Sequence, residues 1–218
     1  MVVRELRAKD VLDETKRLID ISAMEAALYV GTIFAVGIII DYLALGNQKN
    51  GILSAVKIIA DYLITKAIIK RIIEPSPYGS VSGFWLYFRV GFIASIAIVF
   101  GYMLLIIPGI YLMARWLPAY GFALVEEGGA IKALGRSWDE TSDYWRPLLG
   151  ALMLPITVIA IGIGVIVFSE IENGSMSVFS YVIYDFTFSV SGLFFTGIGL
   201  ATYSLLRDRG RELRDVLA

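Results

Sequence analysis

The chain contains no cysteine and no histidine among its 218 residues. The lack of cysteine excludes disulfide bonds, a thiol nucleophile and thiolate metal sites. The lack of histidine removes the commonest general base and the commonest metal ligand. Catalysis by Ser-His-Asp or Cys-His groups is therefore excluded, as is zinc binding through imidazole. We expect a protein that is not an enzyme and that uses no cofactor or metal.

The chain also lacks an excess of charge of either sign. It has 19 basic and 20 acidic residues, so the net charge is −1 and gives no indication of nucleic-acid binding. Apolar residues make up 57% of the chain, compared with roughly 45–50% in soluble domains. The mean hydropathy is +0.72. This composition predicts one membrane domain whose main partner is the lipid bilayer.

Long apolar runs set the expected fold, because a helix of about 20 residues crosses a bilayer. We predict an all-α protein: an integral membrane bundle of six transmembrane helices with amphipathic surface helices. Together these form a membrane domain over 21–206. The expected spans are 21–45, 52–73, 84–106, 109–125, 147–169 and 178–206.

Charged residues interrupt the second expected span, 52–73. Lys57 and Asp61 are four residues apart and therefore share one face of a helix. We favour a span whose charged stripe faces other helices. The alternative is an amphipathic helix on the membrane surface.

Three segments lie outside the expected spans. Residues 1–20 predict a cytoplasmic or interfacial lead-in helix, and residues 207–218 predict a charged cytoplasmic tail. Residues 128–145 predict an amphipathic helix at the interface. With six spans and the amino terminus inside, fourteen Lys and Arg residues face the cytoplasm and only Lys49 lies outside. By the positive-inside rule, both termini of this multi-pass protein are expected to be cytoplasmic.

The middle of the chain combines a turn, a cation and a surface helix. Pro108-Gly109 predicts a sharp reversal, because proline disfavours helix in the residue before it and glycine tolerates tight turns. The run I-I-P-G-I-Y-L-x-x-R-W is followed by V-E-E-G-G-A-I-K-A-L-G-R-S-W-D. This order resembles the glycerophosphoryl diester phosphodiesterase membrane-domain family and its stand-alone bacterial relatives. The matching positions are Pro108, Gly109, Arg115, Glu126, Ala133, Leu134, Arg136, Ser137 and Trp138.

The resemblance implies a six-helix protein of the bacterial inner membrane. Its motifs cover residues 101–146, and the hydropathy pattern extends it over most of the chain. It does not imply diesterase activity. The phosphodiesterases that carry this membrane domain have a separate catalytic barrel that depends on histidine, and this chain has none.

Charged residues inside spans are costly and are therefore candidate functional residues. Arg115 is the first candidate, at about six residues or roughly 9 Å from the expected outer turn. Asp185 and Asp61 lie at depths that allow either of them to pair with it. Lys57 shares the face of Asp61, and Arg89 is near enough to the inner interface to snorkel. These five residues form the candidate intramembrane charge site.

Two interpretations of this charge site stay open. A buried ion pair around Arg115 would fix which helices are neighbours, with little net stabilisation. Alternatively, Arg115 would bind an ion or an anionic substrate. Glu126 and Glu127 end the fourth expected span, where we expect solvated carboxylates or partners for Arg89.

The expected function is non-enzymatic transport or handling of a small amphiphilic or anionic metabolite, with Arg115 and Asp185 central. The alternative is a membrane scaffold or assembly partner that uses its cytoplasmic helices. A third class, an intramembrane enzyme that uses carboxylates, is the least favoured. Small residues at four-residue spacing, such as Gly192/Thr196 and Gly197/Ala201, explain close packing within one chain and would also permit a homodimer.

Overall fold

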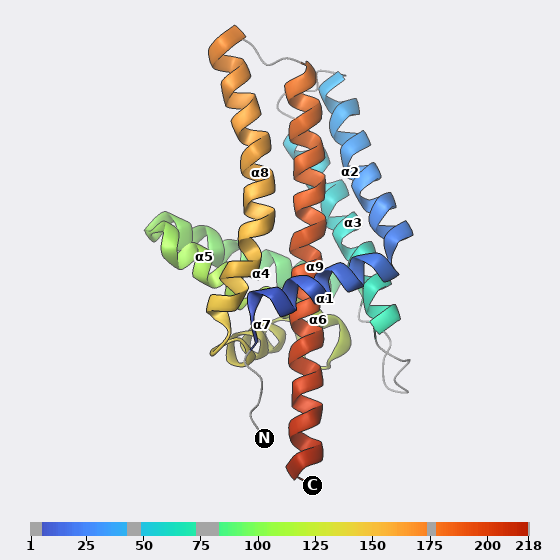
Figure 1. Cartoon of the computed structure of the whole chain (residues 1–218), viewed down its shortest axis with the longest axis vertical. Helices are drawn as coiled ribbons and strands as arrows, with labels where there is room; N and C mark the ends of the chain where they lie inside the picture. Colours follow the sequence, from blue (N-terminus) through green and yellow to red (C-terminus); the bar gives the residue numbers. More distant parts are fainter. Residues whose placement is uncertain (1–5, 43–48, 73–82, 174–177, 218) are drawn as a thin grey trace.

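The computed structural model describes residues 6–42, 49–72, 83–173 and 178–217. Within these residues there are nine helices and no other regular element, which confirms the all-α prediction. Four helices run along the long axis of the molecule (Figure 1). They are α2 (Ala23–Tyr42), α3 (Lys49–Ile72), α8 (Trp145–Asn173) and α9 (Val178–Leu217).

Helix α1 (Ala8–Ile21) lies across this bundle and packs on α9 and α8 (Figure 1). Its sequence is amphipathic, and Val11, Thr15 and Leu18 form the buried face. A Cβ atom added at Gly197 of α9 would lie 2.9 Å from the Thr15 methyl carbon. The lack of a side chain at Gly197 therefore lets the two helices cross in close contact. Residues 1–5 of the expected lead-in segment lie outside the described residues.

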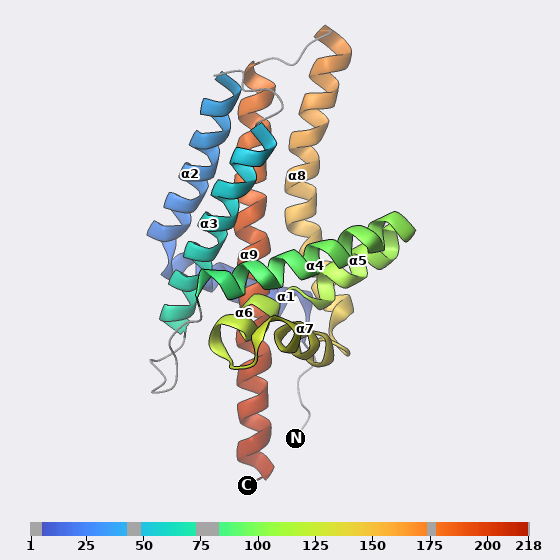
Figure 2. The same cartoon turned by 180° about the vertical axis from the view of Figure 1, so that it is seen from behind.

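Helices α4 (Phe84–Leu104) and α5 (Ile106–Arg115) form a hairpin that runs across the bundle direction (Figure 2). The chain reverses at Leu105, whose backbone is extended, and not at Pro108-Gly109 as predicted. Pro108 lies in the first turn of α5, where a backbone N–H has no partner within the helix. Gly109 instead lets α5 pack closely on α4: a Cβ added at Gly101 of α4 would lie 3.0 Å from the Gly109 Cα.

The expected fourth span, 109–125, is divided between α5 and α6 (Ala119–Val125). These helices have 10 and 7 residues, or about 15 and 10 Å, whereas the bilayer core is about 30 Å thick. Pro118 explains the break, since proline disfavours helix in the preceding residue. The break also lies against α9: a Cβ at Gly199 would be 2.6 Å from the Leu117 carbonyl oxygen.

Helix α7 (Gly129–Glu140) begins at a pair of glycines with positive φ: Gly128, which precedes it, at 135° and Gly129, its first residue, at 80°. These angles are easily adopted only by glycine, which explains the E-E-G-G sequence between α6 and α7. Helix α7 is amphipathic and packs against α6. It falls within the predicted interfacial helix 128–145.

The helices that are apolar enough to cross a membrane are not the same set as the helices that run along the long axis of the molecule. By length and hydropathy, α2, α4, α8 and α9 are able to cross a membrane. Helix α3 is long enough but carries more charge, yet it runs beside α2 and α9 in both views (Figure 1; Figure 2). Helix α4 is apolar enough but lies across the bundle. Four span-capable apolar helices support a membrane protein.

Apolar side chains cover much of the outer surface, as expected for a protein in lipid. The exposed fraction is 77% at Met103 and 79% at Ile107, on either side of the hairpin reversal. Phe168, near the C-terminal end of α8, is 66% exposed. The hairpin tip and the bundle therefore both present apolar surface.

The contact at Gly199 predicts a large effect from one methyl group. Gly199→Ala places its Cβ against the backbone carbonyl of Leu117, so we expect a stability loss of about 1–3 kcal/mol. Gly164→Ala is the matched control, because a Cβ there meets nothing within 4 Å. Thermal unfolding of both variants in detergent checks this. Equal unfolding temperatures would contradict the packing described here.

Candidate functional site

A polar cluster joins α2 and α3 in the middle of the bundle. Lys57 Nζ donates to Asp61 Oδ2 over 2.5 Å, and the Tyr29 hydroxyl donates to Asp61 Oδ1 over 2.6 Å. Gly192 of α9 makes room for both donors: a Cβ there would lie 2.6 Å from the Tyr29 hydroxyl and 3.3 Å from Lys57 Cε. The sequence predicted that Lys57 and Asp61 share a face, and the structure places them in an ion pair.

The ion pair borders two adjoining cavities of about 220 and 380 Å³. The smaller cavity is lined by α3, α4, α5 and α9 together with α6. The larger one lies between α3 and α4, with Tyr120 of α6. Both cavities share six lining residues: Lys57, Asp61, Tyr87, Gly91, Ser95 and Tyr120. Lys57 and Asp61 are thus only partly buried, with side-chain exposures of 27% and 14%.

Two tyrosines also line both cavities. The rings of Tyr87 and Tyr120 are stacked with centroids 4.4 Å apart. The Tyr120 hydroxyl lies close to Gly91, where an added Cβ would be 2.6 Å away. The cavities therefore combine one ammonium group, one carboxylate and hydroxyl groups with apolar walls. Such a lining suits a ligand that has both a charged group and an apolar part.

Arg115 lies outside this site, in a pocket formed by α5 and α7. Its side chain is enclosed, with the residue 4% exposed. Nε donates to the Thr141 hydroxyl over 3.0 Å, and Nη1 donates to the Tyr111 hydroxyl over 2.5 Å. Nη2 donates to the Trp138 carbonyl. The guanidinium also lies 4.1 Å from the centre of the Trp138 ring, in cation–π contact.

The predicted pairs of Arg115 with Asp185 or Asp61 are therefore replaced by other contacts. Asp61 bonds to Lys57 and Tyr29. Asp185 is 2% exposed and packs on α2, since a Cβ at Gly37 would lie 2.7 Å from its carboxyl carbon. The predicted pairing of Arg115 was wrong because it placed this residue at a depth counted along one unbroken helix from Pro108. In the structure that helix ends at Arg115.

Arg89 and Glu126 also have partners other than each other. Arg89 is exposed, and its guanidinium lies over the Trp85 ring at 5.6 Å from the ring centre. Glu126 forms an ion pair with Arg136 of α7. Burial raises the pKa of the Glu126 carboxyl above its ordinary value, and the Arg136 charge opposes this rise.

Several of the positions that carried the family resemblance meet at the junction of α5, α6 and α7, whereas Pro108 and Gly109 lie near the start of α5. The Ser137 hydroxyl donates to the Arg115 carbonyl over 2.7 Å. Together with the Trp138 contacts, this bond ties α7 to the end of α5. Arg115, Ser137 and Trp138 therefore hold two helices together, and we call this group the clasp. Tyr111 and Thr141, which complete the clasp, were missed, although the four-residue spacing of Tyr111 and Arg115 was visible in the sequence.

Tyr29, Tyr87 and Tyr120 were also missed as members of a charged site. Tyr29 is uncharged and distant in sequence from Asp61, so no local pattern connects them. Within the described residues, no group of three or more acidic side chains is placed to hold a metal ion. Comparison with known proteins adds nothing to this picture: no family model, no curated protein and no solved structure matches the chain.

The ion pair predicts a specific pattern of stability changes. Asp61→Leu leaves the Lys57 ammonium without its carboxylate, and we expect a loss of about 1–3 kcal/mol because an ionic donor loses its acceptor. Lys57→Met in the same chain removes the stranded charge and should recover most of that loss. The free energies of unfolding of the two single variants and the double variant, measured in detergent, give the coupling free energy between Lys57 and Asp61. Strictly additive effects would show that the two side chains do not interact.

Proposed function

We propose that the protein is a non-enzymatic membrane protein that binds a small amphiphilic anion in the cavities beside Lys57 and handles it within the bilayer. The observation that carries this proposal is that a lysine inside an apolar bundle borders a cavity. Charged side chains in such places are costly and are usually functional. Arg115, the predicted centre of the site, is enclosed by protein and is assigned a structural role.

The lining of the cavities supports an anionic ligand. An ammonium group has three N–H donors, and among the described residues Lys57 donates to Asp61 alone. Tyr87 and Tyr120, which carry hydroxyl groups, line the same two cavities. Apolar side chains such as Met113 and Phe195 line the remainder, so an alkyl or aromatic part has a place.

We further propose a four-span topology in place of six spans. Helices α2, α3, α8 and α9 would cross the membrane, and the α4–α5 hairpin would lie in its cytoplasmic half. The crosswise direction of the hairpin and the shortness of α5 support this arrangement (Figure 2). An even number of crossings keeps both termini in the cytoplasm, as the basic residues predict. The resemblance to the diesterase membrane-domain family supports a bacterial inner membrane.

A scaffold remains the second candidate function, and one observation favours it. Ile131 on the outer face of α7 is 79% exposed. Together with the apolar tip of the α4–α5 hairpin, Ile131 would form an apolar surface to which a partner protein could bind on the cytoplasmic side. Lys57 has no role in that function, so the variant experiment below separates the two candidates.

Binding can be measured through Trp116, which lines the smaller cavity. The probe is dodecyl phosphate brominated on its chain, added to the full chain in nanodiscs. We expect saturable quenching of Trp116 fluorescence by this anionic probe. Brominated dodecyltrimethylammonium, a cation with the same chain, should quench Trp116 much less. Lys57→Met should weaken binding about tenfold, equivalent to about 1.4 kcal/mol. Trp116→Phe gives the background from the other three tryptophans.

Lys66→Met is the matched control, because Lys66 is on the same helix but does not line the cavities. It should bind the phosphate probe as the unmodified chain does. Equal quenching by the anionic and cationic probes would refute the proposal. Equal affinity in the Lys57 and Lys66 variants would refute it as well.

A further inference from the structure

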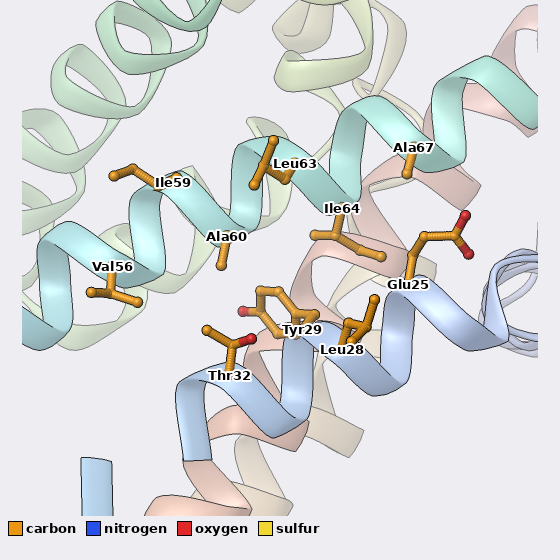
Figure 3. A pocket seen from close by; sticks show the side chains of 10 residues that line it. All are labelled: Glu25, Leu28, Tyr29, Thr32, Val56, Ile59, Ala60, Leu63, Ile64 and Ala67. Carbon is orange, nitrogen blue, oxygen red and sulfur yellow. The ribbon is translucent and has the colours of Figure 1, made fainter. Parts of the chain in front are cut away.

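A second recess, about 450 Å³ in volume, lies between α2 and α3 (Figure 3). Its residues on α3 are Val56, Ile59, Ala60, Leu63, Ile64 and Ala67. None of these lines the cavities beside Lys57, so the recess opens on a different face of α3. We call it the α2–α3 groove.

The groove is apolar and faces the outside of the bundle. On α2, Glu25, Leu28, Tyr29 and Thr32 follow the spacing of one helix face. Leu28 is 63% exposed and, on α3, Leu63 is 57% exposed. In a membrane these side chains face acyl chains. From Val56 to Ala67 the groove follows α3 for about 16 Å.

One end of the groove carries an ion pair. Glu25 lies at the end of the lining nearest Ala67 (Figure 3), and Arg71 is one helical turn beyond Ala67. Arg71 donates to Glu25 Oε1 and to the Ile21 carbonyl. This end is the cytoplasmic one in the proposed topology, because Arg71 and α1 are both there.

Both charged groups keep unused hydrogen-bonding capacity. A guanidinium has five N–H groups, and two bonds from Arg71 are present among the described residues. The Arg71 side chain is 43% exposed. Glu25 Oε2 is shielded from solvent and accepts no hydrogen bond from any residue that the structure describes. The mouth of the groove thus places exposed Arg71 donors beside a buried carboxylate oxygen whose hydrogen bonding is unsatisfied.

We infer that the α2–α3 groove binds one acyl chain of a zwitterionic aminophospholipid, with Arg71 contacting the phosphate and Glu25 the primary ammonium. Charge complementarity selects this headgroup. A purely anionic headgroup would bring its charge beside the Glu25 carboxylate, whereas a headgroup with both signs matches both side chains. The inference goes beyond the proposed function, since the groove and the cavities have no lining residue in common. They are linked only through Tyr29, which lines the groove and whose hydroxyl donates to Asp61.

Native mass spectrometry of the full chain tests the inference. The protein is released from nanodiscs that contain equal amounts of phosphatidylethanolamine and phosphatidylglycerol with identical acyl chains. We expect phosphatidylethanolamine to be retained about fivefold more, as one exposed ionic contact allows. Phosphatidylcholine, which has the same phosphate but no N–H donor, should be retained less than phosphatidylethanolamine. These comparisons need only the unmodified chain.

Variants then assign the preference to the groove. Glu25→Gln removes the acceptor charge and frees Arg71, so the preference should reverse toward phosphatidylglycerol. Glu126→Gln is the matched control, because the Glu126–Arg136 ion pair borders a pocket of only about 10 Å³ and should not affect the ratio. Ala60→Leu narrows the groove and should lower retention of both lipids.

Equal retention of the two lipids by the unmodified chain would overturn the inference. It would also fail if Glu25→Gln shifted the ratio no more than Glu126→Gln does. Lys57→Met should leave the lipid ratio unchanged while weakening the alkyl phosphate probe. A failure of the groove and a failure of the cavity site are therefore distinguishable.

Discussion

The arrangement of this protein depends on the close approach of other elements to α9. Three glycines on this helix each remove a side chain where something else must pass. Gly192 admits Tyr29 and Lys57, Gly197 admits α1, and Gly199 admits the carbonyl of Leu117. Packing between helices in lipid relies on such small residues, because the hydrophobic effect contributes little between apolar surfaces there. The polar cluster, the crossing helix α1 and the break between α5 and α6 are therefore all fixed against one helix.

The polar side chains inside this apolar chain follow two different patterns. The three guanidinium nitrogens of Arg115 each donate to an acceptor on or beside α5 and α7, and the result is a clasp that holds α7 to α5. Around Lys57 the protein supplies one carboxylate and leaves space beside it. An enclosed cation orders the structure, whereas a cation beside a cavity is available to a ligand. This contrast is why the proposed function moves from Arg115 to Lys57.

The sequence was most informative where structure depends on neighbouring residues. Hydropathy predicted an all-α protein with long apolar helices, and the helical spacing of Lys57 and Asp61 predicted that they share a face. The amphipathic segment that contains α7 was visible for the same reason. These features depend on periodicity within one helix, which a single sequence records directly.

Features that depend on contact between distant segments could not be predicted in this way. The hairpin of α4 and α5 has the composition of two spans, and only its packing reveals that it runs across the bundle. Pro118 was a visible signal for the break after α5, but its position against Gly199 was not. Tyr29 carries no charge, so nothing marked it as the partner of Asp61. The predicted partners of Arg115 were wrong because its depth was counted along a single helix over 109–125, which the structure divides into α5 and α6.

An experimental structure of the full chain in nanodiscs of cellular lipid would test most directly whether Lys57 borders an open, ligand-accessible cavity inside the membrane. We predict water or ligand density within hydrogen-bonding distance of Lys57 Nζ, in the cavities that Tyr87 and Tyr120 also line. A bundle in which α4 closes on α3 and leaves Lys57 in contact with protein alone would contradict it.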